Sequence, residues 1–368
     1  MESLNVSKED GSNITNSANP TLDTAMVLRA GPAILILVGF SIIPNTVIVV
    51  GTQLKKSLRG KTYYFIRNLA CCDLLLSLSV ITTLSTTFTA SRSPIPYHTF
   101  NMICKFLIVF PTYWSYTASV QTLVIISIER YRAIYRPTKK VTPKKAKLLC
   151  ALAWLVSFLI SLPFLFSATS VQNQCAQFPS QSRWAIIVNV ILIIFQFVIP
   201  MIVMITAYIL IFRKLRITAT SITRESANSR NLKRKTTSML LATTVTFLLC
   251  ALPWTLMLLL EAVTGKFASQ FFNDHSNLGQ RAIAILGRIS MPISTIYNPV
   301  IYCIYNRKIR QLLFPCYYYY RSKNNSIAAA SGFLSQEKKS NYDNKMVRLS
   351  LQNNFREGIS SLTVVTVT

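Results

Sequence analysis

The side chains best placed to do chemistry in this sequence are charges that interrupt long apolar segments. Asp73 lies in the middle of one such segment, and Glu129 and Arg130 stand side by side at the end of another. Ionised residues are costly inside a membrane, and those that occur there usually serve a function. A carboxylate beside a guanidinium can form an ion pair with it at the end of a span. The alternative is that Arg130 only reaches towards the lipid headgroups.

Enzymatic chemistry has little support in the sequence. Both histidines, His98 and His275, fall in predicted loops, and no pair of carboxylates stands at catalytic spacing within the apolar segments. No glycine-rich phosphate loop or cluster of metal-ligand residues is present. The sequence therefore predicts that the protein is not an enzyme.

The apolar segments that must position these charges are long enough to cross a membrane. Of the 368 residues, 51% are hydrophobic and only 14% are charged, whereas a soluble domain carries about 25% charged residues. A membrane-spanning helix needs about 20 apolar residues, and the strands of a membrane β-barrel would be about half as long. The sequence therefore predicts an all-α integral membrane protein, a bundle of seven transmembrane helices over residues 29–304. The predicted spans lie near residues 29–53, 63–89, 103–134, 147–167, 184–213, 238–264 and 280–304.

The distribution of Lys and Arg between the predicted spans indicates an orientation. The loops after the first, third, fifth and seventh spans are basic, and the other loops are poor in Lys and Arg. Cytoplasmic loops attract these residues, so the N-terminus is predicted to be extracellular and the C-terminus cytoplasmic, in the plasma membrane. The net charge of +27 is then explained by contact with the anionic inner leaflet. No nucleic-acid-binding motif accompanies it.

The sequences on either side of the bundle are polar. Residues 1–28 form a predicted extracellular tail, in which Asn5 and Asn13 begin acceptor triplets for N-glycans. Residues 305–316 have a basic face and a Leu/Phe face, which favours a short amphipathic cytoplasmic helix. Cys316 at its end is a candidate for palmitoylation, the alternative being an unmodified thiol. Residues 317–368 are predicted to be a disordered cytoplasmic tail.

Of the eight cysteines, only Cys104 and Cys175 fall on the predicted outer side. That side is oxidising, so the sequence predicts a disulfide between them.

Several motifs, in order along the chain, resemble those of the rhodopsin-like (class A) G-protein-coupled receptors. The resemblance covers nearly everything from the first span to Cys316. Each motif alone is weak, but the set in this order is specific. It comprises Asn45, "LACCD" with Asp73, Cys104, "ERY" (Glu129 to Tyr131), Trp154, Pro200 with Tyr208, Pro253, and "NPVIY" (Asn298 to Tyr302, with Pro299).

This resemblance implies roles for particular residues. Arg130 would be released from Glu129 on activation and would meet the C-terminal helix of a heterotrimeric G protein. Tyr208 and Tyr302 would swing inwards, and the kink at Pro253 would let the sixth helix move outwards. Threonines in the C-terminal "SLTVVTVT" would, once phosphorylated, recruit arrestin. An allosteric sodium ion is implied at a set of oxygen ligands, with a hydrogen-bonded neutral acid as the alternative; the ligands would be Asp73, Ser119, Ser294 and Asn298.

The sequence departs from the family pattern in three places. The sixth span reads "CALP", so Ala251 stands where an aromatic residue is usual, and Trp254 follows the proline instead. This puts the usual aromatic switch in doubt and leaves open a receptor that signals poorly. Pro44 directly before Asn45 is unusual. The spacing from Cys104 to Arg130 is one residue longer than the common pattern, so the register of the outer part of the third span is uncertain.

The predicted outer half of the bundle indicates the kind of ligand. The third span has Pro111 and Thr112 where amine receptors carry Asp, and the seventh has no Lys for retinal. Aromatic walls with a few polar groups suit a peptide or a small organic ligand. We expect a neuropeptide-like ligand; a small anionic organic or lipid ligand is the alternative. A transporter is a further alternative, but the halves show no internal repeat. The candidate ligand-binding residues are Thr112, Tyr113, Tyr116, Gln196, Trp254, Glu261 and Arg288.

Arg288 has two interpretations. A guanidinium pairs well with a carboxylate, so it could bind an acidic group of the ligand. Alternatively it could form a salt bridge with Glu261 across the mouth of the pocket.

Overall fold

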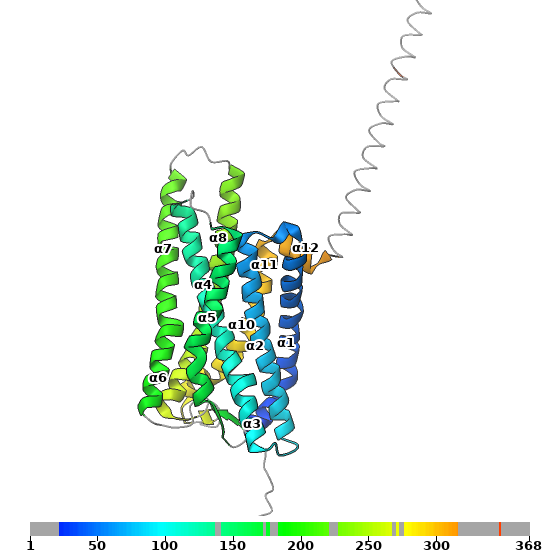
Figure 1. Cartoon of the computed structure of the whole chain (residues 1–368), viewed down its shortest axis with the longest axis vertical. Helices are drawn as coiled ribbons and strands as arrows, with labels where there is room; N and C mark the ends of the chain where they lie inside the picture. Colours follow the sequence, from blue (N-terminus) through cyan, green and yellow to red (C-terminus); the bar gives the residue numbers. More distant parts are fainter. Residues whose placement is uncertain are drawn as a thin grey trace, which may run out of the picture. The chain divides into compact units, whose positions relative to one another are not determined.

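The computed structural model describes residues 22–136, 141–171, 174–176, 183–220, 227–266, 270–271, 276–315 and 346. The chain divides into two compact units, Met1–Leu313 and Phe314–Thr368, and almost all of the described residues belong to the first. The first unit is a bundle of long helices that run side by side (Figure 1). In chain order these are α1 (Leu22–Leu54), α2 (Lys61–Ala90), α3 (Tyr97–Ile103), α4 (Phe110–Tyr135), α5 (Pro143–Ser167), α6 (Arg183–Ile193), α7 (Ile199–Thr220), α8 (Ala227–Thr264), α10 (Leu278–Ser294), α11 (Tyr297–Tyr305) and α12 (Arg307–Leu313).

Five helices in the described part of the chain are long and apolar enough to cross a membrane. They cover Gly31–Leu54, Lys61–Ala90, Pro143–Ser167, Ile186–Arg216 and Lys235–Thr264. The predicted third span, which forms α4, and the predicted seventh, which forms α10 and α11, do not meet this criterion of length and composition. Helix α4 is rich in polar side chains that face the interior of the bundle, where Thr117, Thr122 and Ser127 are fully buried. The neighbouring helices cover these polar groups, so α4 can lie within the bundle although its overall composition is less apolar than the criterion requires.

Two short π-helical stretches adjust the register of long helices. Cys104–Val109 joins α3 to α4, and Ile194–Val198 joins α6 to α7. A π-turn adds one residue to a helix, so the first stretch accommodates the extra residue between Cys104 and Arg130. Each stretch ends two residues before a proline, Pro111 or Pro200. Proline lacks an N–H and clashes with the preceding turn, which explains why the helical ladder loosens at these places.

One end of the bundle carries a disulfide, and we call it the disulfide end. Cys104 and Cys175 are bonded, with Cα atoms 5.4 Å apart, which confirms the predicted pairing. Cys175 lies in a two-stranded antiparallel hairpin of β1 (Thr169–Val171) and β2 (Gln174–Ala176). The side chain of Asn101 accepts hydrogen bonds from Ser170 N and Thr169 Oγ1, both at 3.1 Å. The Tyr97 hydroxyl of α3 also lies 3.4 Å from Thr169 Oγ1. The hairpin is therefore fixed to the start of the α3–α4 helix by one covalent bond and three hydrogen bonds.

The break between α10 and α11 is held by residues from α1. Pro299 has no N–H, so the carbonyl of Thr295, four residues earlier, loses its helical donor. Asn45 Nδ2 donates to this oxygen at 3.1 Å and Ser41 Oγ donates to it at 3.3 Å. Asn45 is fully buried. Its role is therefore to satisfy a backbone carbonyl that the proline leaves without a partner.

Helix α12 is the eighth helix that the sequence predicts, although it is shorter than residues 305–316. Its amphipathic character is visible in the packing, since Ile309 and Leu312 are buried while Arg307 and Lys308 are exposed. A methyl group added to Gly51 of α1 would lie within 2.8 Å of three Leu312 atoms. The glycine thus lets α12 pack closely against α1.

Some helix limits differ from those predicted. Helix α1 begins at Leu22 rather than near residue 29, and α8 begins at Ala227 rather than near residue 238. The extension of α8 is polar enough to resemble a loop, and the extension of α1 carries Asp23. Neither contains proline, and the start of α8 contains good helix formers such as Leu, Lys and Arg. Hydropathy reports the apolar span, whereas helix propensity decides how far the helix continues beyond it.

Candidate functional site

The predicted charge pair lies near the end of α4, at the opposite end of the bundle from the disulfide; we call this the Arg130 end. Arg130 Nε is 2.7 Å from Glu129 Oε2. The contact is an ion pair without hydrogen-bond alignment, because neither atom makes a hydrogen bond. Arg130 Nη2 donates to Thr62 Oγ1 of α2 at 3.1 Å. The Glu129 side chain is only 2% exposed, so water screens the pair little.

A second cation shares the Glu129 carboxylate. Lys61, the first residue of α2, forms an ion pair with Glu129 Oε1, and its side chain is 24% exposed. Glu129 thus carries one cation on each oxygen, and Lys61 and Thr62 tie both members of the Glu129–Arg130 pair to α2. In the sequence, Lys61 is one of the basic residues of the loop after the first predicted span. This contact depends on how α2 packs against α4, because Lys61 and Glu129 are 68 positions apart in the sequence.

The other predicted switch residues lie on helices around this pair. The Tyr208 hydroxyl of α7 is 3.1 Å from Thr244 Oγ1 of α8, which joins those two helices. Tyr302 is fully buried, and its hydroxyl makes no hydrogen bond to any residue that the structure describes. Tyr131 stacks near Tyr135, with ring centroids 4.5 Å apart. Pro253 lies inside α8, and its carbonyl faces Gly287 of α10.

Two of the four residues predicted to hold a sodium ion are in direct contact. Asn298 Nδ2 donates to Asp73 Oδ2 at 2.9 Å, so the structure joins two of the four predicted ligands. Asn298 Oδ1 is buried and makes no hydrogen bond in the described part of the chain. Ser119 is buried, and the Ser294 hydroxyl donates to the Met291 carbonyl at 2.7 Å, which leaves its oxygen able to accept or coordinate. A carboxylate and neutral oxygens form the donor set that such cations prefer.

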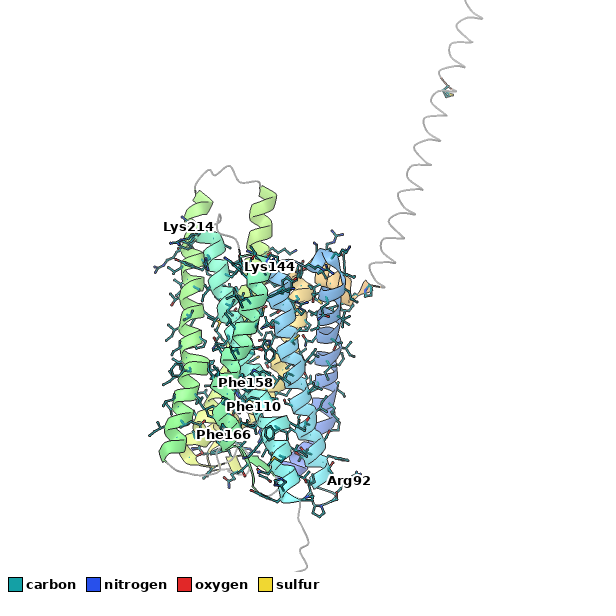
Figure 2. The ribbon with its side chains drawn as sticks, viewed as in Figure 1. Arg92, Phe110, Lys144, Phe158, Phe166 and Lys214 are labelled. Carbon is teal, nitrogen blue, oxygen red and sulfur yellow. A yellow bond between two sulfur atoms is a disulfide. The ribbon has the colours of Figure 1, made fainter. Side chains whose placement is uncertain are left out.

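Several candidate ligand residues form an aromatic cluster in the bundle. Tyr113 of α4 stacks on Phe164 of α5, with centroids 3.5 Å apart and planes 7° apart. Trp254 of α8 lies 6.2 Å from Tyr113 between ring centroids. In Figure 2, Phe110, Phe158 and Phe166 lie in the half of the bundle nearer the disulfide end. Figure 2 also places Arg92 at that end and Lys144 and Lys214 at the other.

Three of the candidate ligand-binding residues bury polar atoms that form no aligned hydrogen bond within the described part of the chain. The atoms are Tyr116 Oη, Gln196 Nε2 and Trp254 Nε1. Gln196 lies in the π-helical stretch between α6 and α7, and it is buried rather than lipid-facing. Buried polar groups normally have partners, so a ligand that supplies hydrogen bonds would satisfy them. The Thr112 hydroxyl, in contrast, is already used, because it donates to the Ile108 carbonyl at 2.6 Å.

Glu261 and Arg288 border the same region without pairing directly. Both charges act on the Tyr113 hydroxyl. Glu261 has an interaction of its own, but no ion pair within 4.0 Å joins it to Arg288, and the structure describes both residues. Arg288 is exposed. The salt bridge considered as an alternative is therefore absent between these two side chains.

The aromatic residue missing at Ala251 is replaced one turn further along α8. Ala251 and Trp254 are both buried. Residues three apart in a helix lie on nearly the same face, so Trp254 points towards the core but sits about 4.5 Å nearer the disulfide end. The bulky aromatic side chain of Trp254 therefore still lies inside the bundle, three residues beyond the usual position.

Some predicted modification sites lie outside the described residues. These are the acceptor asparagines Asn5 and Asn13, the candidate palmitoylation site Cys316, and the threonines of the C-terminal tail.

Comparison with known proteins agrees with this architecture. Residues 44–302 match the family model for the 7 transmembrane receptor (rhodopsin family). The chain is 26% identical over 285 residues to the neuromedin-K receptor of Oryctolagus cuniculus, which covers 75% of this chain but only 58% of that receptor. It is 27% identical over 300 residues to the substance-K receptor of Mus musculus, which covers 77% and 74%. The crystal structure of squid rhodopsin has the same fold, with a TM-score of 0.66 at 21% identity over 80% of this chain and 86% of that one. The chain belongs to the rhodopsin family of 7-transmembrane receptors.

Proposed function

We propose that this protein is a peptide receptor of the plasma membrane that activates heterotrimeric G proteins. The ligand would bind at the disulfide end, and the G protein would bind at the Arg130 end. Outward movement of α8 about Pro253 would connect the two events.

The observation that carries this proposal is the buried group of Lys61, Glu129 and Arg130. A guanidinium held by a neighbouring carboxylate within a bundle is restrained but can be released by movement of the helices around it. The Tyr208–Thr244 contact joins α7 to α8, so separation of these helices would break it. A transporter would instead need a path with polar groups at the middle of the membrane.

A peptide ligand is supported by two features. Two receptors with similar sequences are named for neuromedin K and substance K. The buried donors and acceptors of Tyr116, Gln196 and Trp254 match a ligand rich in carbonyl and N–H groups. Exposed Arg288 supports the second candidate, a ligand with a carboxylate group, which could equally belong to a peptide.

Further proposals follow from the orientation and the family. The Lys/Arg distribution favours an extracellular N-terminus, with glycans at Asn5 and Asn13, and a cytoplasmic C-terminus. We propose palmitoylation at Cys316, which would hold the end of α12 at the membrane, and arrestin recruitment by a phosphorylated tail. A sodium ion at Asp73, Ser119, Ser294 and Asn298 would stabilise the inactive arrangement.

Nucleotide exchange in isolated membranes tests the proposed function. Membranes that contain the full chain are mixed with a panel of heterotrimeric G proteins, first with neuromedin K and substance K and then with a neuropeptide library. We expect peptide-dependent exchange on at least one G protein, and none in membranes that lack the chain. Peptide or solute uptake by the chain without exchange on any G protein would establish transport instead.

Arg288→Ala tests how the ligand is recognised. We expect the half-maximal peptide concentration for exchange to rise at least about tenfold, because a charge-assisted contact with the ligand is lost. The maximal exchange should not change, since Arg288 is far from the Arg130 end. The control is Arg92→Ala, which removes a cation stacked on Phe88 at the same end of the bundle. Unchanged potency of Arg288→Ala would show that this residue does not bind the ligand.

A further inference from the structure

The two cations that hold Glu129 make contacts of different quality. Lys61 Nζ donates a hydrogen bond to Glu129 Oε1, so this ion pair is also an aligned hydrogen bond. Arg130 Nε lies 2.7 Å from Glu129 Oε2, but neither of these two atoms makes a hydrogen bond within the described part of the chain. Hydrogen bonds between ionised groups are the strong ones, so Lys61 holds Glu129 better than Arg130 does.

The poor alignment of Arg130 follows from its place in the sequence. Neighbouring residues of an α-helix do not face each other, so the Arg130 side chain has to turn back along its own helix to reach Glu129. Arg130 Nη2 also donates to Thr62 Oγ1 at 3.1 Å, and Thr62 carries no charge. When Arg130 leaves, it therefore breaks an unaligned ion pair and a hydrogen bond to a neutral acceptor.

Lys61 approaches Glu129 from a helix that is fixed to α4 elsewhere. It is the first residue of α2, and Asn68 Nδ2 of α2 donates to Thr122 Oγ1 of α4 at 2.7 Å. The outward movement under the proposed function concerns α8, which takes no part in either contact. Lys61 can therefore keep its contact with Glu129 while α8 moves.

The formation of α2 does not explain why a lysine stands at this position. The N-terminal end of a helix carries a partial positive charge, so a cation in its first turn is unfavourable. The first turn of α2, which the structure describes in full, has no acidic residue, and no side chain caps it. The carboxylate that compensates for Lys61 is that of Glu129, whose side chain is only 2% exposed.

We propose that Lys61 is a positioning residue of the activation switch, which stays on the Glu129 carboxylate when Arg130 leaves it. This inference rests on the proposed function, because it concerns the release of Arg130. A buried carboxylate left without a partner is strongly destabilising, and Lys61 prevents this once Arg130 has gone. Before the release, the like charges of Lys61 and Arg130 repel each other. Both effects favour release, so Lys61 makes the receptor easier to activate.

Nucleotide exchange in membranes that contain the full chain tests this role, with neuromedin K as the added peptide. Lys61→Met should raise the half-maximal peptide concentration about fivefold and should lower ligand-independent exchange. Lys61→Arg keeps the positive charge, so both quantities should stay within about twofold of the wild type.

The matched control is Lys56→Met, which removes an exposed cation from the loop just before α2. Lys56 is not one of the two cations on Glu129, so we expect exchange to change less than about twofold. Equal shifts in Lys56→Met and Lys61→Met would overturn the proposal, because exchange would then follow the total charge of this end of the bundle.

A thermal shift assay on the detergent-solubilised full chain tests the same contact without a peptide or a G protein. Arg130→Met imitates the departure of the guanidinium. Each of Arg130→Met and Lys61→Met leaves Glu129 with one cation, whereas the double variant leaves it with none. We expect the unfolding midpoint of the double variant to fall by more than the sum of the two single decreases, because the two cations share one partner.

Additive decreases in the midpoint would overturn the proposal, since Lys61 would then not take over Glu129 in the absence of Arg130. Failure of the double variant alone to fold would be the expected result in its extreme form. If the wild type shows no exchange on any G protein, the proposed function fails, and the thermal comparison alone decides whether Lys61 holds Glu129 without Arg130.

Discussion

Replacing Glu129 with glutamine is expected to raise ligand-independent nucleotide exchange about tenfold. The Glu129 carboxylate holds both Arg130 and Lys61, and its removal leaves two cations near each other with no anion between them. Breaking a buried ion pair costs about 3–5 kcal/mol, and Lys61 is partly exposed, so we expect less here. A change of only about 1.4 kcal/mol shifts the population tenfold.

Arg130→Ala should have the opposite result and abolish exchange with and without peptide, because the proposed contact with the G protein is lost. Lys61→Met is the matched control for Glu129→Gln. It removes a cation but leaves the Glu129–Arg130 pair, so the basal rate should not rise. The measurement is GTP-analogue binding by the G protein at equal surface levels of each variant. A basal rate in Glu129→Gln equal to that of the wild type would show that Glu129 does not restrain the inactive state.

Gly287→Ala is expected to lower the thermal unfolding midpoint by several degrees. An added methyl group would lie 2.7 Å from Met257 Cβ and 3.1 Å from the Pro253 carbonyl oxygen. Neither atom can move without its backbone, so α8 and α10 would have to separate. Overpacking of this kind typically costs about 1–3 kcal/mol. Because the contact is at Pro253, this substitution should also change the hinge of α8.

Gly39→Ala provides the control for Gly287→Ala. A methyl group at Gly39 would meet nothing within 4 Å, while both substitutions gain the same helix propensity of about 1 kcal/mol. The comparison is made on detergent-solubilised protein by a thermal shift assay, together with the amount of protein at the cell surface. Equal midpoints for the two variants would mean that α8 and α10 are not closely packed at Gly287.

The sequence predicted the features that depend on local composition. Long uncharged segments predicted the helices, and the two cysteines on one predicted side predicted the Cys104–Cys175 bond. Asp73 and Asn298, each polar within an apolar segment, lie next to each other as their positions in the family motifs imply. These predictions succeed because lipid enforces simple rules on backbone and charge.

Features that depend on how helices pack were not predictable in the same way. By sequence Lys61 belongs to a basic loop, although it contacts Glu129 across 68 positions. The sequence likewise gives no sign that Arg67 of α2 lines a cavity with Lys147 of α5. The one-residue excess after Cys104 was visible in the sequence, but its accommodation by a π-turn depends on tertiary structure.

The hydrogen bonds from Ser41 and Asn45 to Thr295 relate the order of synthesis to the completed bundle. Asn45 leaves the ribosome 250 residues before the carbonyl that it binds. During translation α1 is therefore synthesised long before the Thr295 carbonyl that Ser41 and Asn45 bind. A nascent chain arrested before the last span would expose the polar groups of α1 to lipid or to neighbouring membrane proteins. The last span therefore completes the buried hydrogen bonds of the first.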